Sequence, residues 1–213
     1  MLIFARQKLV FLSVPKTGST AYATALGRHA AVVVSAPPEL KHAPLFRYNR
    51  FFRQMVERFV GPDVRIVAVM REPLDWLGSW YRYRSREELR GHPNSTHGMS
   101  FDSFVQSYCD PEPPDFARVG AQAKFLEPQR NGTRVTHLFR YEDQAALQRF
   151  LGNALGVTVS PEITNPSPER GLALSPGTRD RLYRTCAADF ALYDSIGPDG
   201  SHDMPRPGRR NTS

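Results

Sequence analysis

The chain has 213 residues, of which 40% are hydrophobic and 23% are charged, a composition that supports one packed domain and excludes wholesale disorder. The formal net charge of +7 favours anionic partners such as nucleotides, acidic polysaccharides, nucleic acid or lipid headgroups, without choosing among them. No stretch approaches the roughly 18–20 apolar residues of a membrane span, so no membrane partner is expected.

Apolar runs and amphipathic patterns alternate along the chain, and no internal repeat is visible. Continuous apolar or β-branched runs predict strands at 9–14, 31–34, 64–70 and 135–139. Helical periodicity predicts helices at 20–29, 45–60, 74–89, 101–108, 117–126, 143–155 and 176–193. Strands separated by helices are typical of a single α/β domain, here residues 1–196, with a central parallel sheet flanked by helices. We expect a surface loop at 164–176 and a mobile tail at 197–213.

The two cysteines, Cys109 and Cys186, form neither a CxxC pair nor a metal-ligand spacing. Two free thiols and no metal site are therefore expected. The N-terminal apolar run, residues 8–14, is too short for a signal peptide. Free thiols together with the missing targeting signal predict a cytoplasmic protein.

A candidate anion-binding segment, Val14-Pro-Lys-Thr-Gly-Ser-Thr20, follows a buried strand and opens a helix. First-turn amides of a helix lack internal partners, and the helix dipole favours an anion there. Gly18 permits a tight turn, Ser19 and Thr20 offer hydroxyl groups or a helix cap, and Lys16 adds a cation. The segment is not a Walker A motif, because Lys16 precedes Gly18 and no glycine occurs upstream. An ordinary capped turn is the alternative interpretation.

A second candidate segment, Arg71-Glu-Pro-Leu-Asp-Trp-Leu-Gly-Ser79, begins where the strand at 64–70 ends. Ligands of open α/β sheets bind outside the carboxyl ends of the strands, and the planar fork of an arginine matches a phosphate. Arg71 is thus placed for a second phosphate, and the Ser79 hydroxyl could face the same ligand. The alternative is an ion pair between Arg71 and Asp75, with Ser79 solvated on its helix.

The two segments together resemble those of the sulfotransferases that use 3′-phosphoadenosine 5′-phosphosulfate (PAPS). Residues 15–20 are similar to the 5′-phosphosulfate loop of that family. Its 3′-phosphate motif is similar to Arg71, Pro73, Ser79 and Tyr81. The resemblance covers residues 9–83, with a weaker similarity at 139–143. Short bacterial-type and carbohydrate sulfotransferases look similar in having a late Asn/Ser/Pro-rich segment, here Asn165-Pro-Ser-Pro-Glu-Arg-Gly171.

The resemblance implies a P-loop-like three-layer fold and transfer of a sulfuryl group from PAPS to an acceptor hydroxyl. The donor would be held by Pro15, Lys16, Thr17, Gly18, Ser19 and Thr20 at its 5′-phosphosulfate and by Arg71 and Ser79 at its 3′-phosphate. Lys16 would also neutralise the bridging oxygen as the leaving group departs, and no metal is required. In-line transfer of this kind relies on positioning and electrostatics.

The chain departs from the cytosolic members of the family, because it lacks their late Arg-Lys-Gly loop. Its own late loop offers Arg170, either as a further donor-binding residue or as a surface arginine. The general base is also open between His42 and Glu39. His42 is favoured because it follows the second predicted strand and because an unperturbed histidine pKa suits the role.

The acceptor is not identified by the sequence. Arg47, Arg50 and Arg53 recur at three-residue spacing, and arginines and tyrosines alternate at 81–86, which favours a sugar or a polyanion. A solvated helix face is the alternative. Two other functions stay open: a P-loop-type kinase for a small metabolite, and a non-enzymatic basic domain that binds nucleotides or nucleic acid. Nucleic acid is not an expected partner, since no recognition motif occurs. The sequence does not indicate an oligomeric state.

Overall fold

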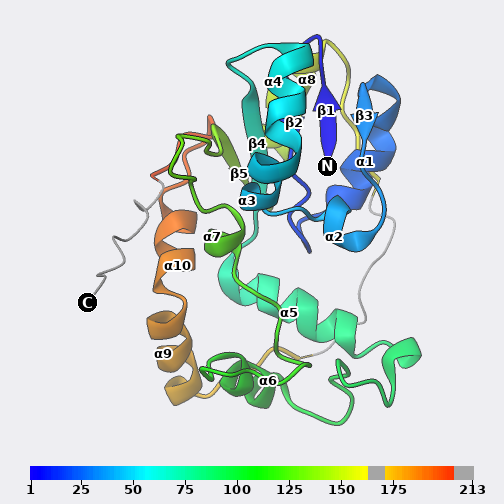
Figure 1. Cartoon of the computed structure of the whole chain (residues 1–213). Helices are drawn as coiled ribbons and strands as arrows, with labels where there is room; N and C mark the ends of the chain where they lie inside the picture. The colour runs from blue at the N-terminus through cyan, green and yellow to red at the C-terminus, as the bar shows by residue number, and fades with distance from the viewer. Residues whose placement is uncertain (163–170, 204–213) are drawn as a thin grey trace.

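The computed structural model describes residues 1–162 and 171–203 and shows an α/β chain built on a five-stranded mixed sheet (Figure 1). The strand order is β3-β1-β2-β4-β5. The strands are β1 (Leu2–Phe4), β2 (Leu9–Phe11), β3 (Val32–Val33), β4 (Arg65–Met70) and β5 (His137–Arg140).

The half of the sheet formed by β2, β4 and β5 is parallel, as the sequence predicts. The remainder is not, because β1 pairs antiparallel with both β2 and β3. Residues 5–8 connect β1 to β2 in a tight turn, in which the Lys8 amide donates to the Ala5 carbonyl at 3.2 Å. So short a connection allows only an antiparallel pair. The prediction of a wholly parallel sheet is therefore wrong at this edge, where β1 was not predicted.

Helices cover both faces of the sheet because its strands are apolar on both faces. On one face, Leu9 and Phe11 of β2 pack with residues of α1 (Ser19–Leu26) and α8 (Gln144–Leu155). On the other face, Val10 and Ile66 pack with residues of the helical segment 45–60 and with Leu192. The last lies on α10 (Ala187–Asp194).

A third apolar cluster lies beyond the carboxyl ends of the parallel strands. It joins α5 (Pro73–Arg84) to α6 (Phe101–Tyr108) and α9 (Pro176–Thr185) through buried residues such as Leu77, Phe104 and Leu182. In Figure 1, α5 runs between the sheet and these two helices. This placement brings α5 close to the ends of β2 and β4, where the two candidate segments begin.

Most predicted helices are present, with local differences. The segment 45–60 is interrupted by a π-helical turn, so it comprises α3 (Leu45–Arg47), the turn Tyr48–Phe52 and α4 (Arg53–Val60). The last predicted helix is divided at Cys186 into α9 and α10. The helix predicted at 117–126 is reduced to α7 (Gln122–Phe125). A short helix that was not predicted, α2 (Pro38–Lys41), leads into His42.

The first residues of the predicted tail pack against β5. The Leu138 amide donates to the Gly200 carbonyl at 2.9 Å. A Cβ at Gly200 would lie 2.8 Å from the Phe139 ring, so a side chain there would clash. The mobile tail predicted from residue 197 therefore does not include 197–203, and its remaining residues lie outside the described chain. Within residues 1–162 and 171–203, no helix is long and apolar enough to cross a membrane. Cys109 and Cys186 are buried free thiols.

Candidate functional site

The loop between β2 and α1 has a constrained backbone. Lys16 has a φ of 65° and Gly18 a φ of 72°, and Gly18 is the N-cap of α1. The Thr17 hydroxyl donates to the Val14 carbonyl at 2.9 Å, so this buried side chain holds the loop instead of facing a ligand. Because the capping residue is a glycine, no side chain at that position occupies the first-turn amides of α1. The loop has the geometry of an anion site.

Tyr141 closes this loop from the end of β5. A Cβ built on Gly18 would lie 3.2 Å from Cε2 of Tyr141, so only glycine fits there without displacing the ring. The Arg71 guanidinium lies over the same ring, 4.4 Å from its centroid. Tyr141 thus joins the two candidate segments through one aromatic ring.

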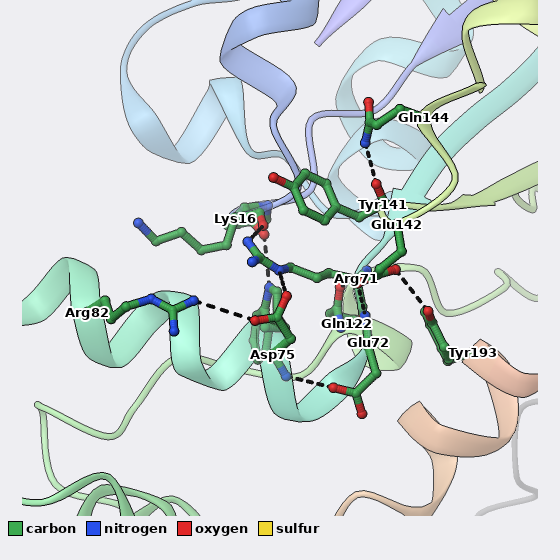
Figure 2. Close-up of polar contacts among 12 residues, drawn as sticks. Lys16, Arg71, Glu72, Asp75, Arg82, Gln122, Tyr141, Glu142, Gln144 and Tyr193 are labelled. Atoms are coloured by element: carbon green, nitrogen blue, oxygen red, sulfur yellow. Dashed lines mark hydrogen bonds and ion pairs between the residues drawn. The ribbon is translucent and has the colours of Figure 1, made fainter. Parts of the chain in front are cut away.

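Arg71 reaches the loop from the end of β4, as Figure 2 shows. Its Nη1 donates to the Lys16 carbonyl at 3.3 Å, and its Nε lies 2.6 Å from Oδ2 of Asp75. The ion pair is the alternative that the sequence offered for Arg71. These contacts use two of the five N–H donors of the guanidinium. The buried Gln122 side chain fixes the backbone of Arg71, since it accepts from its amide at 3.0 Å and donates to its carbonyl at 2.8 Å.

Helix α5 is tied to the loop by its first turn. Pro73 lies at the start of the helix, and the Glu72 carboxylate accepts from the Asp75 amide at 2.7 Å as a cap. The Trp76 indole then donates to the Pro15 carbonyl at 2.9 Å. One turn later Ser79 is buried and lines the same cavity as the loop. Ser79 is therefore not solvated, and it lines the cavity beside the loop.

The cavity has a volume of about 1110 Å³ and lies between the loop, α2, α5 and the end of β5. Among the described residues, five lysines and arginines line it against one carboxylate, that of Glu39. These cations are Lys16, Lys41, Arg71, Arg82 and Arg86. Of the predicted donor residues, Thr17 is not part of the lining. The lining does include Pro15, Lys16, Gly18, Ser19, Thr20, Arg71 and Ser79. The cavity is therefore suited to a polyanionic ligand.

The Lys16 ammonium group does not point toward Arg71. In Figure 2 its side chain extends away from the Arg71 guanidinium. Its Nζ lies 3.3 Å from the centroid of the Tyr83 ring and 4.9 Å from that of Trp80. Burial, and then the nearby Arg86, Arg71 and Arg84, lower the pKa of Lys16 from 10.5 to about 7. An anion in the cavity would reverse this electrostatic penalty and favour the ammonium form.

His42 lies at the end of α2 and lines the cavity, as does the exposed Glu39. The His42 Nδ1 is 2.7 Å from the Ser13 carbonyl oxygen. Because a carbonyl only accepts, Nδ1 carries the proton, and Nε2 of the neutral ring has a free lone pair. Burial lowers the pKa of His42 below 6.5, the Ser13 hydrogen bond opposes this shift, and Lys41 adds to it. The neutral form that a general base requires therefore predominates near pH 7.

The other predicted acceptor residues are divided between the cavity and other surfaces. Arg82, Tyr83 and Arg86 line the cavity, whereas Arg47, Arg50 and Arg53 are not part of its lining. Arg53 instead pairs with Glu57 at 2.7 Å. Arg170 lies outside the described residues.

Tyr141 and Gln122 are site residues to which the sequence assigned no role. For Tyr141 the available signal was the weaker family similarity at 139–143, at the end of a predicted strand. The sequence carried no signal for Gln122. No group of three or more His, Cys, Asp or Glu residues that could hold a metal ion occurs in the described ranges, 1–162 and 171–203.

No protein-family model matches the chain, and a comparison with curated proteins finds no match.

Proposed function

We propose that this protein is a sulfotransferase that moves the sulfuryl group of PAPS to an acceptor hydroxyl, on a P-loop-like three-layer fold. The observation that carries the proposal is the convergence of two anion-binding elements on one cationic cavity. The loop from Pro15 to Thr20 suits the 5′-phosphosulfate, and Arg71 with Ser79 suits a 3′-phosphate. A second phosphate position separates PAPS from nucleotides that carry phosphate only at the 5′ end.

The residues provide the groups that in-line transfer needs. The acceptor oxygen attacks sulfur, and the bond between sulfur and the bridging oxygen breaks. The electron pair leaves with 3′-phosphoadenosine 5′-phosphate (PAP). Lys16 neutralises the charge on that oxygen, after its ammonium leaves the Tyr83 ring for the donor. His42 Nε2 receives the hydroxyl proton. The hydrogen bond from His42 Nδ1–H to the Ser13 carbonyl oxygen holds the ring in the orientation for this role.

Turnover tests the proposal. The chain is incubated with PAPS and hydroxyl acceptors that include neutral sugars and acidic polysaccharides, and PAP release is measured by chromatography. We expect PAP release that increases with an acceptor, is abolished in Lys16→Met, and is strongly reduced in His42→Gln. A Glu39→Gln variant separates the two candidate bases, because it should stay active if His42 is the base. Production of ADP from ATP and magnesium, with no PAP from PAPS, would instead establish the kinase.

A further inference from the structure

The helical segment 45–60 has one buried face and one unusually apolar exposed face. Leu45, Tyr48 and Val56 are buried against the sheet. The opposite face exposes Phe46, Phe51, Met55 and Phe59, which we call the apolar stripe. Phe59 is 83% exposed and Phe51 61% exposed. Four large apolar side chains along one helical face form a patch that soluble proteins rarely leave uncovered.

The π-helical turn gives the stripe its continuity. Phe51, Met55 and Phe59 follow one another at four-residue intervals, which places them on one side of a helix. Phe46 precedes Phe51 by five residues, and the π-helical turn Tyr48–Phe52 accommodates that extra residue. In Figure 1, α4 lies on the outside of the sheet, in front of β2 and β4. The exposure of the four side chains of the stripe places them on the outer side of this segment.

Arginines border the stripe. The segment contains Arg47, Arg50, Arg53 and Arg58 but one acidic residue, Glu57, which pairs with Arg53. The Arg50 guanidinium lies 5.3 Å from the centroid of the Phe51 ring, and that of Arg47 lies 5.7 Å from Phe46. Cations therefore lie directly beside the exposed aromatic rings.

We propose that the segment 45–60 docks the protein on a membrane surface that contains anionic lipids. An apolar stripe with bordering arginines is what an interfacial helix presents, since aromatic rings enter the headgroup region while cations pair with anionic headgroups. A second copy of the chain fits less well. A two-fold interface brings the same face together, and the arginines of both copies would then oppose one another. This docking differs from the expectation of no membrane partner, which considered only spanning segments.

Sedimentation with vesicles tests the docking. The chain is mixed with vesicles of phosphatidylcholine alone and with vesicles that also contain phosphatidylglycerol. We expect binding to the anionic vesicles that weakens with salt. In Phe51→Ser/Phe59→Ser the binding falls by roughly a hundredfold, because two phenyl groups that insert into the membrane are lost. In Arg50→Gln/Arg58→Gln it falls by roughly 30-fold, since each cation near the surface contributes about fivefold.

Tyr183→Ser is the matched control, because Tyr183 is an exposed aromatic residue on α9, away from the stripe. It should bind vesicles like the wild type. Melting temperatures near that of the wild type would show that the variants fold, since the replaced side chains are exposed. Absence of wild-type binding to anionic vesicles, or unchanged binding by Phe51→Ser/Phe59→Ser, would overturn the proposal. A dimer abolished by that double variant, without vesicle binding, would assign the stripe to a second copy. PAP binding is independent of either outcome, because the stripe does not line the cavity.

Discussion

Gly18 is the position where the backbone geometry of the loop bears most directly on the proposed ligand binding. Its φ is 72°, and a Cβ there would lie 3.2 Å from the Tyr141 ring. In Gly18→Ala the left-handed backbone costs about 1–2 kcal/mol. The Tyr141 ring must also shift by a few tenths of an ångström. Since the Arg71 guanidinium lies over that ring at 4.4 Å, the shift displaces the group proposed to hold the 3′-phosphate.

We expect Gly18→Ala to lower both the stability of the fold and the affinity for PAP. The free energy of unfolding falls by about 1–2 kcal/mol, measured by urea denaturation. PAP affinity, measured by calorimetry, falls by about 10- to 150-fold, which corresponds to one charge-assisted hydrogen bond of about 1.5–3 kcal/mol.

Gly156→Ala separates the two effects. Gly156 has a φ of 69° at the end of α8, and nothing lies within 4 Å of an added Cβ. We expect a similar loss of stability there with PAP affinity unchanged. Wild-type PAP affinity in Gly18→Ala, at an unfolding free energy like that of Gly156→Ala, would refute the role of this loop.

Three further predictions concern the cavity. The pH profile of kcat/KM should rise through the lowered pKa of His42 and fall above pH 7, because the pKa of Lys16 in the empty cavity is about 7; a profile that stays flat above pH 7 would contradict it. The free energy of unfolding of the unliganded chain should increase from pH 7 toward 10.5, because in this range the unfolded chain binds the Lys16 proton and the folded chain does not. Urea denaturation should show that Lys16→Met loses this increase. An unchanged increase in that variant would exclude Lys16 as its source. Tyr83→Leu should lower transfer and move the alkaline limb of the profile, whereas Tyr83→Phe keeps the ring beneath Lys16 and should behave as wild type; equal effects of both would show that the ring is not the contact that matters.

The strands that carry the site were predictable because each is a continuous apolar run. The runs at 9–14 and 64–70 contain β2 and β4, and both candidate segments begin at their carboxyl ends as expected. β1 was missed because its three residues are too few to show a period, and its pairing with β2 changes the sheet from parallel to mixed. The π-helical turn was missed because apolar residues recur on both sides of it, and one extra residue between them does not stand out in the sequence.

The side-chain partners within the site were less predictable than its backbone. Lys16 and Arg71 were expected to face a ligand, but only the structure shows the Tyr83 ring beneath one and Tyr141 beneath the other. These partners are far apart in the sequence and meet through the packing of α5 and β5. In the sequence, Thr17 is a hydroxyl residue like its neighbours Ser19 and Thr20. In the structure its hydroxyl turns inward and donates a hydrogen bond to the Val14 carbonyl.

Thermal stabilisation by PAP, compared with AMP and with ATP plus magnesium, tests the central claim most directly. A ligand that binds only the folded chain stabilises it by about 2.7 kcal/mol at a hundredfold excess over its dissociation constant. We predict a large increase in melting temperature with PAP, a small one with AMP, and loss of the difference in Arg71→Ala. An equal increase with PAP and AMP, or a preference for ATP with magnesium, would contradict the PAPS-dependent sulfotransferase.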